Sequence, residues 1–178
     1  VPNRGGVSFA EYEQGDYVIG GLENWGASGL AGAWAEENTR ESIFNAFRRK
    51  ETFATSGPRI LVRFFGGYDL DELTFENENI IKDAYGSGVP MGGDIFEEET
   101  DKAPSFLIWA QRDVNGAPLQ RIQVIKGSIS RADSRPTEKV YDVACSDGLE
   151  VDPQTNRCPD NGARVDIETC AISKNVGA

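Results

Sequence analysis

Histidine is absent from this chain of 178 residues. Zinc and catalytic transition-metal sites rely on imidazole, and so do most nucleophile–base pairs. The sequence also contains no Walker loop, dinucleotide fingerprint, GxSxG elbow or HExxH motif. We therefore expect no autonomous hydrolase of these types, and no catalytic residue, metal ligand or cofactor in this chain.

Positive charge and long apolar runs are scarce too. Lysine and arginine number 18 against 29 acidic residues, giving a net charge of -11 that disfavours a nucleic-acid partner. No apolar run approaches the roughly 18 residues of a membrane span, and no signal-peptide-like leader opens the sequence. The composition, 39% hydrophobic, is that of a soluble globular protein. The densest acidic run, Glu97 to Glu99 with Asp101, is interpreted as a solvated loop rather than a cation site.

Only three cysteines occur, namely Cys145, Cys158 and Cys170, in a tail rich in Pro, Asp, Asn and Gly. Without a CxxC pair a zinc knuckle is disfavoured. Cysteines clustered in loops suit disulfides in an oxidising compartment, which predicts a periplasmic or secreted protein. A Cys145–Cys158 bridge would close a short loop and add about 3 kcal/mol of stability. The odd count leaves one thiol free or paired elsewhere.

A helix is predicted over residues 38–50, and the rest of the chain is organised around it. Asn38 is the expected N-cap, with Glu41 as the third helical residue of a capping box. Acidic residues precede this helix and basic residues end it, as the helix dipole favours. We expect the segment 55–58, which contains Gly57 and Pro58, to stop it. Ile43, Phe44 and Phe47 form a narrow apolar stripe that requires a partner surface.

The remainder reads mainly as strands. Alternation and β-forming residues predict strands at 59–65, 105–111, 119–126, 138–145 and 163–169, and a second helix at 77–85 with Ile80, Ile81 and Ala84 inward. Gly66 and Gly67 are expected to end the first strand, and the Asn115-Gly116 turn to join the second and third as a hairpin. Tyr141 and Val143 should alternate against Asp142 and Ala144. The predicted fold class is α+β, mostly β: an antiparallel β-sandwich-like domain preceded by a glycine-rich arm, residues 1–34, and one amphipathic helix.

Three polar residues near the helix start are the candidate site. Glu36 and Glu37 could form a carboxylate pair for acid–base work, but their position before a helix is already explained by its dipole. Arg40 could meet an anion, or it could pair with either glutamate. Aromatic residues offer further pocket walls, although packing is the commoner role for Tyr17, Trp25 and Trp34.

Two other kinds of site are weighed. A binding surface for carbohydrate or protein could use Trp109, Tyr141 or Tyr68, but core packing also explains such side chains. A calcium-stabilised loop could use Asp147, Asp152, Asp160 and Asn161, although their spacing does not match an EF-hand.

Several long stretches carry a resemblance to a known family. They read GLAGAWAEENTRESIFNAFRRKETFATSGPRILVRFFGGYD, GVPMGGDI, APSFLIWAQRDVNGAPLQRIQVIKG and EKVYDVACSDGLEVDPQTNRCPDNGARVDIETCAISK, and together they run from Ser28 to Lys174. They resemble the C-terminal part of the bacterial domain-of-unknown-function family 3604. That family is similar to the PHP (polymerase and histidinol phosphatase) metal-dependent phosphoesterases.

The resemblance implies that residues 1–57 are the remnant of a PHP-like barrel and that 58–178 form a sandwich-like accessory domain, incomplete at its C-terminus. The family's metal-binding residues precede this segment, so no ligand is carried over, and a divalent metal is expected in the missing N-terminal barrel domain. The family also continues past Ala178 with another cysteine, a natural partner for the unpaired thiol.

The expected function is thus that of a non-catalytic accessory segment of a metal-dependent phosphoesterase-like hydrolase, inactive alone. The alternative is a carbohydrate- or protein-binding β-sandwich module. The stripe of Ile43, Phe44 and Phe47 would face the barrel in the parent. In this chain it would lie on the sandwich, on the arm, or on a second copy in a homodimer.

Overall fold

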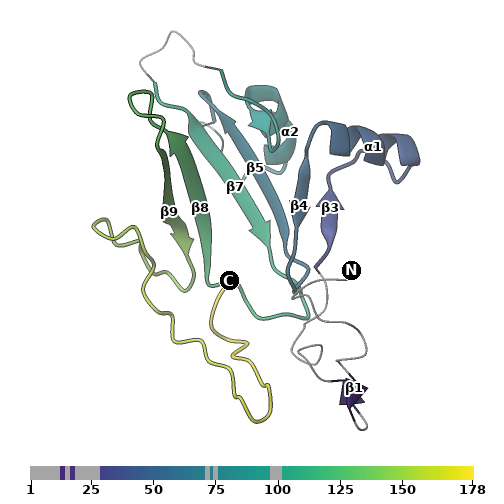
Figure 1. Ribbon diagram of the computed structural model, residues 1–178, viewed down its shortest axis with the longest axis vertical. Helices are drawn as coiled ribbons and strands as arrows, with labels where there is room; N and C mark the ends of the chain where they lie inside the picture. The colour runs from purple at the N-terminus through teal and green to yellow at the C-terminus, as the bar shows by residue number, and fades with distance from the viewer. Residues whose placement is uncertain (1–12, 15–16, 19–28, 71–72, 74–75, 97–101) are drawn as a thin grey trace.

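The computed structural model describes residues 13–14, 17–18, 29–70, 73, 76–96 and 102–178 (Figure 1). Its elements in chain order are β1 (Glu13–Gln14), β2 (Tyr17–Val18), β3 (Ala31–Ala33), α1 (Arg40–Arg48), β4 (Thr52–Ala54), β5 (Leu61–Gly67), α2 (Ile80–Ser87), β6 (Val89–Pro90), β7 (Ser105–Gln111), β8 (Arg121–Ile129) and β9 (Pro136–Cys145). The strands pair antiparallel as β1–β2, β3–β4, β6–β5–β7 and β8–β9. The predicted class, α+β and mostly β, is confirmed. Trp25 and the acidic run at 97–101 lie outside the described residues, as does the side chain of Tyr17.

Strand β5 lies between β6 and β7 and divides its side chains between two faces as the alternation predicts. On one face Phe65, only 2% exposed, packs with Leu107 and with Ala84 of α2 in the main buried cluster. Ile80 and Ile81 of α2 pack against the same cluster, which confirms the predicted inward face of the second helix. This cluster fixes α2 over the sheet, because burial of each large apolar side chain stabilises the fold by roughly 1.5–3 kcal/mol.

The other face of β5 looks toward β8. Val62 and Phe64 of β5 and Ile108 of β7 line a groove of about 380 Å³ together with Ile122 and Val124 of β8. Figure 1 shows the β8–β9 hairpin on one side of β7 and the β3–β4 pair beyond β5 on the other. The β6–β5–β7 sheet and the β8–β9 hairpin thus meet along an apolar groove in which these five side chains are half-buried. The predicted β-sandwich stays a prediction.

The predicted hairpin between 105–111 and 119–126 is wrong. Strand β7 pairs with β5, and β8 pairs with β9. The Asn115-Gly116 segment does turn, since the Gly116 amide donates to the Asp113 carbonyl at 3.0 Å. However, Asp113 Oδ2 also accepts from the Arg59 amide at 2.8 Å, which ties the turn to the chain just before β5. The local turn signal was correct, but long-range pairing decided which strands meet.

The predicted end of one strand is wrong, and so is another predicted strand as a whole. Gly66 and Gly67 are the last residues of β5 rather than its terminator. A Cβ at Gly67 would lie 3.0 Å from the carbonyl oxygen of Ser87, so glycine there permits the close approach of the end of α2. The expected strand at 163–169 is reduced to one isolated bridge, with Ile167 90% exposed. Asp166 accepts from the Glu168 and Thr169 amides at 2.9 and 3.0 Å, so local turns replace a sheet partner.

The start of α1 is one residue later than predicted. Thr39, not Asn38, is the N-cap, and its hydroxyl accepts from the Ser42 amide at 3.3 Å. Glu41 is therefore the second helical residue and cannot complete a capping box. The Ser42 hydroxyl instead accepts from the Glu37 amide at 3.2 Å, which closes the turn before the helix.

The end of α1 also comes earlier than predicted. The Lys50 amide donates to the Phe47 carbonyl and the Glu51 amide to the Ala46 carbonyl, at 3.0 and 3.1 Å. With Lys50 at φ 60°, this is a Schellman ending. Residues 52–54 then form β4 beside β3, so the segment 55–58 does not stop the helix.

The apolar stripe of α1 is largely uncovered. Phe44 is 59% exposed and Phe47 52% exposed, whereas Ala46 is fully buried. The sheets and the described part of the arm therefore do not provide the burial that the spacing of these side chains led us to expect. Neither helix in the described residues has the length and apolar character needed to cross a bilayer. The proposed division of the chain at residue 57 stays a prediction.

Asp142 is a buried anchor for the C-terminal tail. Its carboxylate accepts from the Cys158 amide at 2.7 Å and from Gln123 Nε2 at 2.6 Å, and it forms ion pairs with Arg157 and Arg121 at 3.3 and 3.5 Å. These interactions, with the Cys158 hydrogen bond foremost, lower the pKa of Asp142 to about 2. A bulge between Ile122 and Gln123 sets Gln123 opposite Asp142.

The Cys145–Cys158 disulfide is confirmed and lies beside this anchor. Cys170 is a free, exposed thiol. The tail then returns to the sheet, because the backbone groups of Ala178 and Leu119 exchange two hydrogen bonds of 2.9 Å. The tail after β9 is thus held by covalent, ionic and backbone contacts rather than by strand pairing.

Replacing Asp142 with Asn should weaken the tail and change its dependence on pH. Because the folded pKa of about 2 is below the ordinary 3.8, the unfolded chain binds more protons between these values, and stability rises with pH there. The contribution is complete above roughly pH 5 and is lost as the pH falls toward 2. We expect Asp142→Asn to lower the Tm at neutral pH and to flatten the fall in Tm between about pH 5 and 2, measured by circular dichroism.

The control is Asp94→Asn, at an exposed carboxylate. A residual slope is expected, because six other aspartates also have lowered pKa values. Equal Tm profiles for the two variants would contradict the anchoring role of Asp142.

Removal of the disulfide should destabilise the oxidised protein by about 3 kcal/mol, because it frees a loop with a sequence separation of 13. We expect this loss in the free energy of unfolding by urea for Cys145→Ser combined with Cys158→Ser. Cys170→Ser is the control and should change the free energy of unfolding by less than about 0.5 kcal/mol. A comparable loss for Cys170→Ser would show that the exposed thiol is not free in solution.

Candidate functional site

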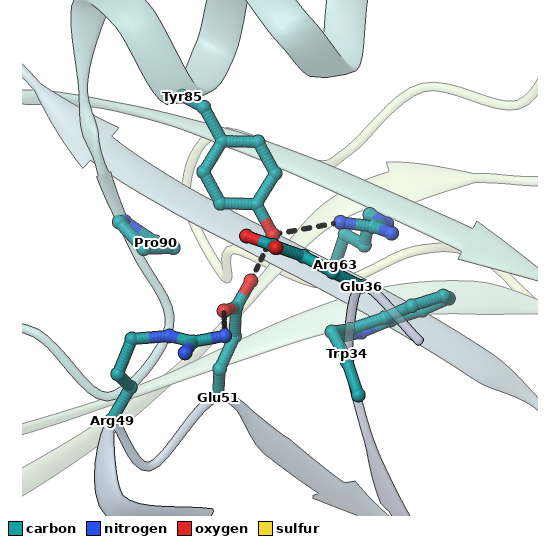
Figure 2. A pocket seen from close by; sticks show the side chains of 8 residues that line it. Trp34, Glu36, Arg49, Glu51, Arg63, Tyr85 and Pro90 are labelled. Carbon is teal, nitrogen blue, oxygen red and sulfur yellow. Dashed lines mark hydrogen bonds and ion pairs between the residues drawn. The ribbon is translucent and has the colours of Figure 1, made fainter. Parts of the chain in front are cut away.

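A cleft of about 590 Å³ lies where the β3–β4 pair, the end of α1, β5 and α2 meet (Figure 2). Its lining residues are Trp34, Ala35, Glu36, Arg49, Glu51, Arg63, Tyr85 and Pro90. Two carboxylates, two guanidinium groups and a phenol face one concave surface there. Polar groups converging in a cleft of this size are typical of binding sites, so this is the candidate functional site.

Glu51 is the buried centre of the cleft, with only 3% of its surface exposed. The Schellman ending of α1 positions its amide, and its carbonyl accepts from the Trp34 amide at 3.0 Å. The carboxylate accepts a hydrogen bond from the Tyr85 hydroxyl and pairs with Arg49 at 3.4 Å. A buried carboxylate needs such partners, so Glu51 joins α1, β4 and α2.

Tyr85, on the last turn of α2, connects Glu51 to Arg63. Its ring packs edge-on against Phe65, with centroids 5.0 Å apart, and its hydroxyl accepts from Arg63 Nη1 at 3.1 Å. Burial raises the pKa of Tyr85, and the hydrogen bond and charge of Glu51 raise it further, against the lowering effect of Arg63. The phenol therefore stays protonated at neutral pH and donates to Glu51.

Arg63 projects from β5 on the same face as Phe65. Its guanidinium carbon lies 3.7 Å from the centroid of the Trp34 ring. Trp34 donates a 2.9 Å hydrogen bond from its Nε1 to the Val62 carbonyl. Its ring also packs against the Phe53 ring, with centroids 5.5 Å apart. In the described residues Arg63 forms no ion pair with a carboxylate. It is a cation fixed by an aromatic ring and a neutral phenol.

The three residues predicted from the helix start are only partly brought together. Glu36 lines the cleft. Glu37 lies outside the cleft in an adjoining shallow depression, which Glu36 and Arg49 also line. Arg40 is exposed and pairs with neither Glu36 nor Glu37 in the part of the chain that is described. The closeness of the three to a substrate stays a prediction.

Three residues of the cleft were not singled out from the sequence: Glu51, Arg63 and Tyr85. Arg63 did carry a signal, because it is the single charge within the otherwise apolar stretch 60–65. A lone arginine on the inward face of a strand demands a partner. Glu51 and Tyr85 had no local signal, since their burial depends on contacts between elements far apart in sequence.

The aromatic residues considered for a binding surface lie on separate elements. Trp109 of β7 borders the space under α2 beside Ile80 and Ile81. The ring of Tyr141, on β9, lies under the ammonium of Lys139, with Nζ 4.6 Å from the ring centroid. Tyr68, after β5, donates to the Phe96 carbonyl at 3.3 Å. They do not form one platform.

Two of the four proposed calcium ligands meet, because Asp147 accepts from Asn161 Nδ2 at 3.2 Å, and it also accepts from the Ser146 hydroxyl at 2.7 Å. Asp160 instead pairs with Arg164 at 3.2 Å. Asp152 accepts from the Gln154 amide at 2.8 Å. Across the described ranges no three His, Cys, Asp or Glu side chains come together as potential metal ligands.

Loss of the Tyr85 hydroxyl should destabilise the protein by roughly 1–3 kcal/mol, because buried Glu51 would lose a donor. We expect this change for Tyr85→Phe in urea unfolding. In an alkaline absorbance titration, the variant should also lack a phenol that ionises above the ordinary pKa of 10.0. The control Tyr141→Phe, at a half-buried ring on β9, should cost less than about 0.5 kcal/mol. Equal costs for the two replacements would refute the role of Tyr85 as a partner of Glu51.

No curated protein and no solved structure shows significant similarity to this chain. A family model does match, and it covers residues 8–178, which include every residue of the cleft. The family is described as "Protein of unknown function (DUF3604)". Since the match extends over almost the whole sequence, the chain belongs to the DUF3604 family.

Proposed function

We propose that this chain is a non-catalytic accessory segment of a metal-dependent, phosphoesterase-like hydrolase. In this proposal the metal ligands and the reaction belong to a histidine-bearing, PHP-like barrel domain, and the present chain completes and stabilises that domain. The partner surface is the apolar stripe of α1. The disulfide supports a site of action in an oxidising compartment, the periplasm or the cell exterior of a bacterium.

The observation that carries the proposal is the exposed apolar face of α1. Phe44 and Phe47 lie three residues apart and therefore on one side of the helix, and each is more than half exposed. Figure 1 shows α1 at the outer edge of the molecule, extending away from β3 and β4. Adjacent exposed aromatic side chains on an ordered helix are typical of an interface.

The cleft supports a non-catalytic role for the isolated chain. Its buried carboxylate, Glu51, is already neutralised by Arg49 and hydrogen-bonded to Tyr85. Tyr85 has a raised pKa and is protonated at neutral pH. Because the sequence contains no histidine, the cleft has no histidine-based nucleophile–base pair. Its exposed carboxylate, Glu36, is already explained as a charge placed before a helix.

Docking can be tested by mixing the oxidised chain with the histidine-bearing barrel domain of a DUF3604 family member. We expect a 1:1 complex by size-exclusion chromatography with light scattering. Phe44→Ser combined with Phe47→Ser should weaken it by at least about tenfold, since two aromatic anchors are lost. Ile167→Ser is the matched control, because Ile167 is also exposed but lies in the tail.

Two outcomes would overturn the docking proposal. One is the absence of a complex. The other is a homodimer of the chain alone that the Phe44 and Phe47 replacements dissociate. Hydrolysis of p-nitrophenyl phosphate by the chain alone with added Mn²⁺ or Zn²⁺, above the metal blank and lost in Glu51→Gln, would overturn the non-catalytic role.

A further inference from the structure

We propose that the cleft beside α1 binds a hydroxylated carboxylic acid of the uronic-acid type, with Arg63 holding the carboxylate. This ligand site is independent of docking through α1, because Phe44 and Phe47 do not line the cleft. It also differs from the aromatic surface of Trp109, Tyr141 and Tyr68 considered from the sequence.

In the described residues Arg63 is a fixed cation with unused hydrogen-bond donors. Its guanidinium stacks on Trp34 at 3.7 Å and gives one donor to Tyr85 at 3.1 Å. Arginine has five N–H donors, and in the described residues Tyr85 is the one hydrogen-bond acceptor that Arg63 uses. A half-buried cation held in one orientation, with free donors in a cleft, is pre-organised for an anion.

The charged residues of the cleft limit the charge of the ligand. Arg49 and Glu51 offset each other as a 3.4 Å pair, and Glu36 and Arg63 add one charge of each sign to the same lining. One added negative charge can be met by Arg63, but a second would face Glu36 and Glu51 without a further cation. A phosphate monoester carries about -1.5 to -2 charges at neutral pH. A carboxylate carries one, and its planar shape matches the fork of a guanidinium.

The remaining lining of the cleft indicates what kind of molecule carries the carboxylate. The Arg63 guanidinium and the Phe53 ring both pack against the Trp34 ring and leave little of its face for stacking. Glu36 is exposed and has no hydrogen-bond partner in the described residues, so its carboxylate can accept from ligand hydroxyls. A cleft of about 590 Å³ is within the usual range for small ligands. A hydroxyl-rich ring bearing a carboxylate fits this combination better than an apolar acid.

The test is a titration of the ¹⁵N-labelled, oxidised chain with methyl galacturonide, which carries one carboxylate, followed at the Trp34 indole N–H by NMR. We expect a saturable shift. Methyl galactoside and galactose 6-phosphate should bind at least about fivefold more weakly, since the first lacks the carboxylate and the second brings excess charge. A flat titration, equal binding of methyl galactoside, or tighter binding of the sugar phosphate would each overturn the proposal.

Variants identify the residue responsible. Arg63→Gln should weaken methyl galacturonide binding at least about tenfold, and Arg63→Lys by an intermediate factor because the charge remains without the fork. Arg131→Gln, at an exposed arginine of the β8–β9 loop, should leave binding within about twofold. Binding that persists unchanged in Arg63→Gln would overturn the assignment.

Glu36→Gln provides a second measurement that leaves Arg63 and its stacking intact. It should improve binding of galactose 6-phosphate relative to methyl galacturonide by about threefold or more, because one like charge is removed. An unchanged ratio would overturn the charge argument even if Arg63→Gln failed to fold. Failure of these titrations leaves the docking proposal untouched, since that proposal is measured by complex formation and by variants on α1.

Discussion

The need to satisfy a buried negative charge determines how the first half of this molecule is assembled. Glu51 follows α1 directly, and 97% of its surface is removed from water. An ionised carboxylate in such a place is tolerated only with donors on its oxygens. One donor comes from Arg49 at the helix end and the other from Tyr85 on α2. Satisfying this one side chain therefore brings α1, β4 and α2 to a common point, and the cleft is the space left between them.

The same constraint operates in the second half around Asp142. There the donors are a side-chain amide, two guanidinium groups and the backbone amide of Cys158. The tail after β9 has little regular pairing of its own, so its position depends on this carboxylate together with the disulfide. The two halves differ in whether the neighbouring arginines are paired. Around Asp142 both arginines, Arg121 and Arg157, form ion pairs with the carboxylate. In the described residues Arg63, which lies in the same cleft as Glu51, forms no ion pair.

Local patterns predicted the elements well where apolar side chains repeat at a regular period. The alternation along β5, the inward face of α2 and the limits of β7 follow from periodicity, because β5, α2 and β7 contribute side chains to one buried cluster. Patterns failed where a partner far along the chain decides. Asn115 and Gly116 form the predicted turn, yet β8 pairs with β9. The alternation along β9 did not tell which face is buried, and the burial of Asp142 depends on partners far along the chain.

The cleft shows why a functional site of this kind is hard to read from one sequence. Glu36 was singled out because acidic residues before a helix form a local pattern. Arg63 could have been, as the lone charge in an apolar strand. Glu51 and Tyr85 are 34 residues apart. The sequence around either one gives no sign that the two side chains form a hydrogen bond. A carboxylate that is buried and satisfied, beside an arginine that is fixed and unpaired in the described chain, is a property of the assembled elements. That asymmetry between two neighbouring charges, rather than any motif, is what makes this cleft suited to a ligand that carries a single negative charge.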